Sequence, residues 1–399
     1  MGLRRTPSFV VLTLLSCGGR SGLGELAGSE LGGARADGGA AMTLAAAGHG
    51  GAHAGQSQAG AVGTLGGGGG SSAAAGSNSL GGADAGGGGA AIGAWTTLHH
   101  TEPPPPHDNP FDWVGIPSAF TDVWSDDPGR ALIATATTNY KAPPTGGVVR
   151  FERGELLGFD IGEGLRYQPP RFAGLSMSDL WLAEDYFGLR HSDGAAWTIY
   201  AEPAAQLIWE SAPNDLWVCA PRTAPSPVTT YQLLHLVGGV WSLFALPTAD
   251  NFVPHGLWSR SPTDTFVAGS TGTLLHWNGT NFEVRQCPGV DVWNAVWGDA
   301  AAVWTVGTGG AVARWQGEKC TLLSTESLLG GVRVLSDIWG SGPDNVWIVG
   351  QQGSILRWNG RALELEPSGL SVDLNAVWGH ASGVVWAVGN NETLLRRAF

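Results

Sequence analysis

The hydrophobic pattern between residues 335 and 360 consists of three short apolar runs separated by turns. The first run, Leu335–Trp339, ends in a Gly-Ser-Gly-Pro-Asp segment. The second, 346–349, is apolar at every position, which predicts a strand buried on both faces. The third, 355–358, precedes Asn359-Gly360, a strong signal for a tight hairpin. We therefore predict an antiparallel meander that needs similar units to cover its two faces.

Such units occur along the chain, because the pattern is present in seven copies, including the one just described. Each copy is anchored on its first tryptophan or on the residue that takes its place. The anchors are Trp124, Ala173, Trp209, Trp258, Trp297, Trp339 and Trp378, and successive anchors lie 36 to 49 residues apart. Repeats of this length with four short strands each are typical of β-propellers. We predict an all-β fold, a seven-bladed β-propeller with four-stranded antiparallel blades.

The two ends of the repeat region complement each other. Residues 95–99 resemble the fourth strands of the repeats, such as 239–246, whereas the last repeat ends at Phe399 after its third strand. A propeller must avoid unpaired strand edges. We therefore predict that 95–99 completes the seventh blade and that the folded domain spans 94–399.

The first 17 residues have the pattern of an export signal, with Arg4 and Arg5 followed by the apolar stretch 9–15. The segment Leu-Leu-Ser-Cys that ends at Cys17 resembles the lipobox of bacterial lipoproteins. The resemblance implies that Cys17 is diacylated and begins the mature protein, and two acyl chains give stable anchoring. We expect an exported protein, lipid-anchored at the cell envelope, with the outer membrane favoured by Gly18-Gly19. The alternative is an ordinary secreted protein.

Residues 18–93 are mostly Gly, Ala and Ser, which predicts a disordered, flexible tether. The glycine run 66–70 lacks the preceding strand and the following Gly-Lys-Ser/Thr of a phosphate loop. The tether therefore carries no predicted cofactor site.

Composition supports a single large core outside the tether. The chain has 399 residues, 19 Trp and 43% hydrophobic residues, enough for one domain. A net charge of −13 argues against binding of nucleic acid or of an anionic membrane surface. We expect a monomer that touches the membrane only through its lipid anchor.

Three cysteines remain after the lipidation candidate, namely Cys219, Cys287 and Cys320. An exported, oxidising location permits disulfides. Cys287 and Cys320 both fall near fourth strands of neighbouring blades, so they are a candidate disulfide. Three reduced thiols are the alternative, and none of the cysteines has the spacing of a zinc site.

The phrases DIWGSGPDNVWIVG, NAVWGHASGVVWAVG and LLHWNG resemble the tryptophan-rich repeat β-propeller lipoproteins of myxobacteria and related bacteria. The resemblance covers the whole chain and implies a propeller on a Gly/Ser-rich tether. It implies no particular activity.

No catalytic motif accompanies the repeats. The sequence lacks HExxH, GxSxG and phosphate-loop patterns, and no repeat carries the arginine and tyrosine–glutamate set of a sialidase. The strict recurrence of the tryptophans favours packing between blades over a carbohydrate platform. We therefore predict no cofactor, no metal and no catalysis.

Function is expected where the repeats differ. The extra residues lie in second-to-third turns and in the links between blades, which share one face of a propeller. The candidate binding residues on that face are Tyr140, Lys141, Arg166, Tyr167, Arg171, Arg222, Phe252 and His255. We expect a module that binds or scaffolds an unknown envelope protein or glycan. The alternatives are a structural spacer or a polysaccharide-active enzyme, a glycosidase or lyase, which would show paired carboxylates in the central funnel.

Overall fold

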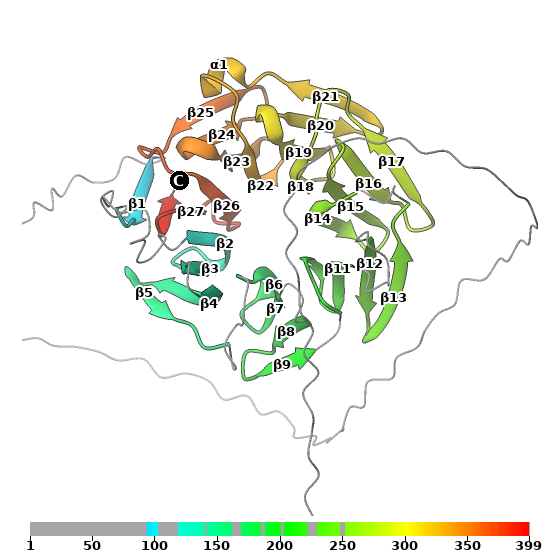
Figure 1. Ribbon diagram of the computed structural model, residues 1–399, viewed down its shortest axis with the longest axis horizontal. Coiled ribbons are helices and arrows are strands. Elements are labelled where there is room, and N and C mark those ends of the chain that lie inside the picture. Colours follow the sequence, from blue (N-terminus) through cyan, green and yellow to red (C-terminus); the bar gives the residue numbers. More distant parts are fainter. Residues whose placement is uncertain are drawn as a thin grey trace, which may run out of the picture. The chain divides into compact units, whose positions relative to one another are not determined.

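The computed structural model describes most of the repeat region. The residues it describes are 94–102, 119–139, 142–161, 169–184, 188–200, 203–221, 230–247 and 252–398. Within them, 28 strands form seven four-stranded antiparallel sheets arranged as the blades of a ring (Figure 1). The predicted seven-bladed propeller is therefore confirmed.

Each blade runs from an inner first strand to an outer fourth strand. Blade 1 consists of β2 (Ala119–Asp127), β3 (Arg130–Asn139), β4 (Ala142–Glu152) and β5 (Glu155–Gly158). Blade 2 consists of β6 (Arg171–Ser176), β7 (Asp179–Glu184), β8 (Gly188–Ser192) and β9 (Trp197–Tyr200). Blade 3 consists of β10 (Leu207–Ala212), β11 (Asp215–Pro221), β12 (Tyr231–Val237) and β13 (Val240–Ala245).

The remaining blades follow the same plan. Blade 4 consists of β14 (Pro254–Ser261), β15 (Asp264–Gly269), β16 (Thr273–Trp277) and β17 (Phe282–Gln286). Blade 5 consists of β18 (Trp293–Gly298), β19 (Val303–Gly307), β20 (Val312–Gln316) and β21 (Lys319–Leu323), and a short helix, α1 (Glu326–Leu329), follows it. Blade 6 consists of β22 (Leu335–Gly342), β23 (Asn345–Gly350), β24 (Ser354–Trp358) and β25 (Leu363–Pro367).

Blade 7 joins the two ends of the folded region, as the sequence predicted. Its strands are β26 (Leu374–Gly379), β27 (Val385–Gly389), β28 (Thr393–Arg397) and β1 (Trp95–His99). Trp95 pairs with Arg397 and Thr97 with Leu395 in an antiparallel register. The ring is therefore closed by strand pairing between segments that are almost 300 residues apart in the chain, and β28 keeps no open edge.

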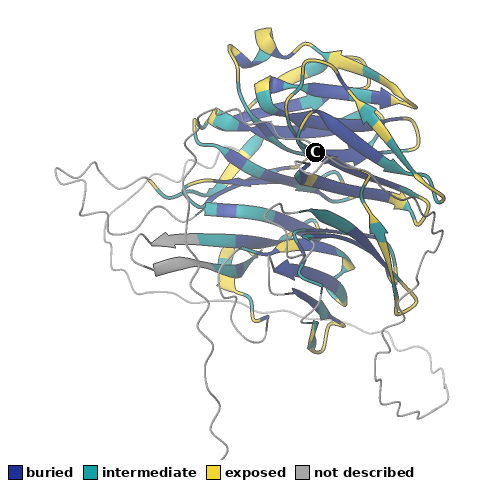
Figure 2. Cartoon of the chain, turned by 45° about the vertical axis from the view of Figure 1, so that its right-hand side comes forward, coloured by how far each residue is buried: buried dark blue, intermediate teal, exposed yellow. Residues whose placement is uncertain are grey.

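The core lies between the sheets rather than at one centre. Buried residues concentrate on the second and third strands, whereas exposed residues gather at turns and outer strands (Figure 2). The second strands β15, β19, β23 and β27 are buried almost throughout. This matches the continuous apolar runs in the sequence, because each blade is covered on both faces by its neighbours.

The anchor tryptophans form a repeated joint between neighbouring blades, which we call a seam. Each packs on the small residue that follows the anchor in the next blade: a Cβ on Gly340 would lie 2.5 Å from the Trp297 ring, and one on Gly298 2.8 Å from Trp258. At the closing seam the Trp378 indole N–H donates to the Ser125 carbonyl at 3.0 Å. The expected role of the recurrent tryptophans in packing between blades is confirmed.

The seam between blades 2 and 3 departs from this pattern on both sides. Blade 2 has Ala173 where the other blades have tryptophan, and blade 3 has Glu210 where they have Gly or Ser. Glu210 is only 6% exposed. The two departures are opposite in size, because the larger side chain of this seam stands in blade 3 rather than in blade 2.

Two further expectations can be compared with the structure. Cys287 and Cys320 form a disulfide with an S–S distance of 1.96 Å, so the predicted bridge between blades 4 and 5 is confirmed, and Cys219 is a buried free thiol. The extra residues of blade 1 fall between the second and third strands, as the sequence predicted, and the described ones, 142–145, belong to β4. Thr137 pairs with Thr145, and Asn139 with Ala142, because strand pairing of β3 and β4 satisfies the inserted backbone.

Candidate functional site

A cavity of about 520 Å³ occupies the middle of the ring. Its lining residues come from the first strands of all seven blades. Four anchor tryptophans line its deeper part, namely Trp209, Trp297, Trp339 and Trp378. The rings of Trp209 in blade 3 and Trp378 in blade 7 lie 6.1 Å apart, so they meet across the axis. The tryptophans therefore narrow the central cavity at the end where the anchor residues lie.

The other end of the cavity is polar. It is lined by residues three positions before the anchors, including His255, Asn294, Ser336 and Asn375. Asn390, in the turn between β27 and β28, also lines it. First strands follow the blade links, so this end lies at the face of the links and second-to-third turns. That face is the one on which the sequence placed the candidate binding residues.

Two aspartates in the cavity wall tie neighbouring blades together. The Asp122 carboxylate in blade 1 accepts hydrogen bonds from the backbone N–H groups of Val123 and of Phe172 in blade 2, both at 2.9 Å. Asp337 in blade 6 accepts from the N–H of Val377 in blade 7, also at 2.9 Å. The two carboxylates occupy equivalent places in their repeats, and each bridges to the next blade.

Burial dominates the acid–base behaviour of both aspartates. It raises the pKa of Asp122, although the Arg171 charge and the two backbone N–H donors oppose the shift. Burial also raises the pKa of Asp337 to about 7, and the negative charge of Asp122 adds to this shift. Burial therefore opposes the charged form of both carboxyl groups in the cavity wall.

Two asparagines extend these ties around the cavity. The Asn294 side-chain N–H donates to the Leu335 carbonyl at 2.8 Å, and that of Asn375 donates to the Phe120 carbonyl at 2.9 Å. Asn375 also donates to the side-chain oxygen of Asn390 at 3.1 Å. Most polar groups of the wall are thus engaged in holding blades 5, 6, 7, 1 and 2 together.

Arg171 and His255 differ from the other polar residues of the wall. Both are exposed, and within the described part of the chain neither has a hydrogen bond or an ion pair. Both line the central cavity and a second hollow of about 240 Å³ beside it. Burial lowers the pKa of His255, and the positive charge of Arg171 lowers it further. The two side chains are therefore close neighbours with free donor groups.

The structure brings together two of the eight residues proposed from the sequence, Arg171 and His255. Phe252 corrects the prediction, because it is 4% exposed and packs in a core cluster with Leu257 and Val267. The Phe252 ring lies against Gly269 at the end of β15, where a Cβ would be 2.8 Å from it. Five candidates lie outside the described residues: Tyr140, Lys141, Arg166, Tyr167 and Arg222.

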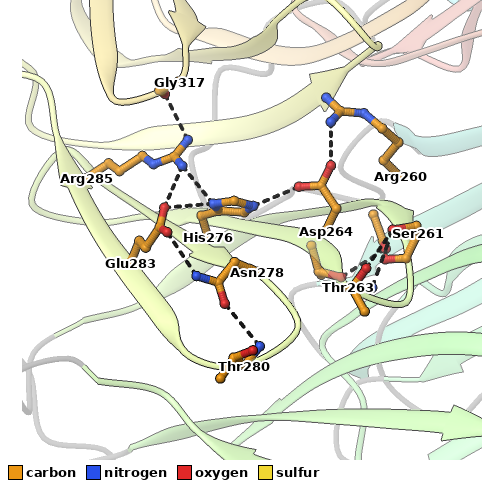
Figure 3. A network of polar contacts seen from close by, with 12 residues as sticks. Arg260, Ser261, Thr263, Asp264, His276, Asn278, Thr280, Glu283, Arg285 and Gly317 are labelled. Carbon is orange, nitrogen blue, oxygen red and sulfur yellow. Dashed lines mark hydrogen bonds and ion pairs between the residues drawn. The ribbon is translucent and has the colours of Figure 1, made fainter.

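A second polar network lies in blade 4, around His276 (Figure 3). Its Nε2 is 2.7 Å from an Asp264 carboxylate oxygen, and Arg285 donates to its Nδ1 at 2.7 Å. Arg285 also donates to Glu283 at 2.7 Å, and Arg260 pairs with Asp264. The network borders a small hollow of about 180 Å³.

The histidine–aspartate pair at the centre of this network recurs in other blades. We therefore attribute the pair to the stability of the fold. His191 pairs with Asp179 at 2.8 Å and stacks on Trp181 at 4.1 Å. His235 pairs with Asp215 at 2.7 Å, and it too stacks on a second-strand tryptophan. The sequence contained a signal for these pairs, because a histidine stands opposite the aromatic residue of the second strand in each of these blades. Repetition in three blades indicates stabilisation of each sheet rather than ligand binding.

The described residues were compared with the requirements of a metal site and of a membrane-spanning helix. Among the described residues, no group of three or more His, Cys, Asp and Glu side chains could hold a metal ion. No helix among them is long and apolar enough to cross a membrane.

Comparison with known proteins shows the fold. No protein-family model matches the sequence, and no curated protein matches it. The structure of YCF48 from Cyanidioschyzon merolae has a TM-score of 0.55 at 13% identity, covering 76% of this chain and 99% of that one. A structure titled YCF48 bound to D1 peptide has a TM-score of 0.52 at 15% identity, covering 76% and 98%. The WD40 β-propeller domain of Doa1 has a TM-score of 0.53 at 12% identity, covering 76% and 96%.

Proposed function

We propose that this protein is a binding or scaffolding module that holds a partner polypeptide at the central cavity. The observation that carries the proposal is the pair Arg171 and His255, whose polar groups are free at the polar end of the cavity. Binding sites combine a few hydrogen-bond donors that lack partners in the protein with apolar surface, here that of the anchor tryptophans. One propeller of similar fold is described as bound to a peptide, which supports a polypeptide partner.

Site-specific photo-crosslinking tests this proposal in the full chain. The variant His255→p-benzoylphenylalanine places the crosslinker at the cavity mouth. The matched control, Leu243→p-benzoylphenylalanine, places it on the outer strand β13, where the side chain is 60% exposed. We expect a discrete crosslinked partner from position 255 and none from 243. Equal labelling at both positions, or none at 255, would refute the assignment of the binding face.

A second candidate function is supported by one observation. Asp122 and Asp337 share the cavity wall, and the charge of one raises the pKa of the other, as in the carboxyl pairs of glycosidases. On this reading, the protein cleaves a polysaccharide in the funnel. Their hydrogen bonds to the backbone of neighbouring blades favour the binding module instead, because they assign both carboxylates a structural role.

A polysaccharide assay separates the two candidates. The full chain would be incubated with neutral and acidic polysaccharides, and newly formed reducing ends or unsaturated products measured. An enzyme would show turnover that Asp337→Asn removes and that Asp344→Asn, in an exposed turn, leaves intact. A binding module would show no turnover with any of the three proteins.

We also propose that the protein is exported and anchored at the cell envelope through Cys17, in the outer membrane, with the partner a protein or glycan there. The leader pattern and lipobox-like segment support this, and a disulfide is compatible with an oxidising compartment. Cys17→Ser should move the protein from the membrane fraction to the soluble fraction. The control Ser29→Ala, in the tether, should leave the fractionation as it is. If Cys17→Ser stays with the membrane, the lipid anchor is wrong.

A further inference from the structure

The polar groups of the cavity can be divided into those already engaged and those left free. Both carboxylate oxygens of Asp122 accept backbone N–H groups, and the amides of Asn294 and Asn375 donate to carbonyls of the next blade. Asn390 accepts from Asn375 through its side-chain oxygen, which leaves its NH2 group to donate elsewhere. The groups left free around the cavity therefore include hydrogen-bond donors, beside the side-chain oxygens of Asn294 and Asn375.

Arg171 is the strongest of these donors. Its charge influences the pKa of Asp122, Asp337 and His255, so it lies near all three. It nevertheless makes no ion pair with the described residues, and the Asp122 oxygens accept backbone N–H groups instead. An unpaired guanidinium presents a planar fork of donors that matches a carboxylate in two-point geometry.

We propose that the mouth of this cavity binds a carboxylate group of a partner polypeptide, with the Arg171 guanidinium as its main contact. The inference rests on the proposed binding function and names the chemistry that this site recognises. His255 in blade 4 and Asn390 in blade 7 line the same cavity and add donors from other sides. The carboxylate belongs either to the C-terminus of the partner or to an acidic side chain.

The charges in the wall favour a singly charged anion. A dianionic phosphate would bring two negative charges to one guanidinium, and the charge that Asp122 and Asp337 retain would oppose the second of them. A carboxylate brings one negative charge to one positive charge. The tryptophan floor, which includes Trp209 and Trp378, offers apolar surface to the residue that carries the carboxylate. A volume of about 520 Å³ suits one or a few residues rather than a folded domain.

The test uses the full chain and three short peptides that carry a C-terminal carboxylate, no carboxylate or a side-chain carboxylate. The first is Ac-Ala-Ala-Ala-Leu with a free C-terminus, the second is its C-terminal amide, and the third is the amide Ac-Ala-Ala-Glu-Leu-NH2. Dissociation constants are measured from the change in tryptophan fluorescence. Hydrogen bonds to charged groups predict about tenfold or tighter binding of a carboxylate peptide than of the plain amide.

The three peptides identify the source of the carboxylate. Tighter binding of the first peptide indicates a C-terminus, and tighter binding of the third indicates an acidic side chain. In Arg171→Ala this preference should disappear, while Arg171→Lys should retain part of it. Arg361→Ala removes an exposed arginine outside the cavity and should change nothing.

Three results would overturn the inference. They are equal affinity of wild type for all three peptides, no binding of any, or displacement of the peptides by inorganic phosphate at lower concentrations than by acetate. The crosslinking at position 255 reports independently on the binding module. A partner captured there without carboxylate preference would leave the proposed function standing and remove only the carboxylate.

Discussion

The seam between blades 2 and 3 predicts an unusual pH dependence of stability. Burial raises the pKa of Glu210 from 4.5 to about 8 in the folded protein, and the nearby charge of Asp179 adds to the shift while the Trp181 indole opposes it. Below pH 4.5 the carboxyl group is neutral in both states and its ionisation costs nothing. Between pH 4.5 and about 8, folding must suppress an ionisation that the unfolded chain makes freely, so stability falls over this range and levels off above it. A shift of this size corresponds to roughly 3–5 kcal/mol.

Glu210→Gln should remove this penalty, because glutamine is neutral at every pH. We expect the free energy of unfolding of Glu210→Gln, relative to wild type, to rise by roughly 3–5 kcal/mol between pH 5 and pH 9. Urea unfolding of the full chain at both pH values measures it. Asp337 and His235 also titrate with shifted pKa values, but both proteins contain them, so their effects cancel in the difference.

Glu318→Gln, at an exposed position, is the matched control and should shift stability by no more than a few tenths of a kcal/mol at either pH. Parallel pH profiles of wild type and Glu210→Gln would refute the reasoning. They would mean that the carboxyl group reaches water or a cation in the folded protein.

The same seam allows a test of the volume exchange. At pH 5, Ala173→Trp should overfill the seam and Glu210→Gly should leave a cavity, each costing about 1–3 kcal/mol. The double variant rebuilds the tryptophan-on-glycine joint of the other seams. Its loss should fall below the sum of the single losses by about 1–3 kcal/mol in the same urea assay. Strict additivity would show that the two residues do not compensate each other.

Three other predictions concern the ring. Gly340→Ala would place a Cβ 2.5 Å from the Trp297 ring and should lower the free energy of unfolding by about 1–3 kcal/mol in urea. Gly158→Ala, in open space, is the control and should be nearly neutral. Equal effects of the two variants would contradict close packing of tryptophan on glycine at the seam. Reduction of the Cys287–Cys320 disulfide, which spans 33 residues, should lower the free energy of unfolding by about 3–4 kcal/mol, and an unchanged urea midpoint would be contrary evidence. Deletion of 94–100 removes β1 and should cause concentration-dependent association in light scattering, because β28 gains an open edge; a stable monomer would argue against closure by pairing.

The sequence was most informative about strands and their recurrence. A run that is apolar at every position, such as 346–349, reports burial on both faces, and its repetition predicts a ring because no single meander can cover itself. The closure by Trp95–His99 was also predictable, since a fourth strand was present at one end and missing at the other. These features depend on local patterns that survive without knowledge of the tertiary structure.

The cavity was only partly predictable. Arg171 and His255 were noted as variable positions of blade links, but Asp122 and Asp337 were not. They lie more than 200 residues apart, and only the ring brings them to one wall. Alignment of the seven copies on their anchors would have found both, because each stands two residues before its anchor. The burial of Phe252 follows from how one link packs, for which the repeat pattern carries no signal.

The sequence alone determined the number of blades, the identity of the strands, their closure and the disulfide candidate, because each depends on periodicity and on which blades are consecutive. The tertiary structure decided which side chains share the axis and which donors stay free there. It also placed Ala173 and Glu210 at one seam between neighbouring blades. These outcomes depend on contacts between neighbouring blades, where volume and hydrogen bonding are matched in space rather than along the chain.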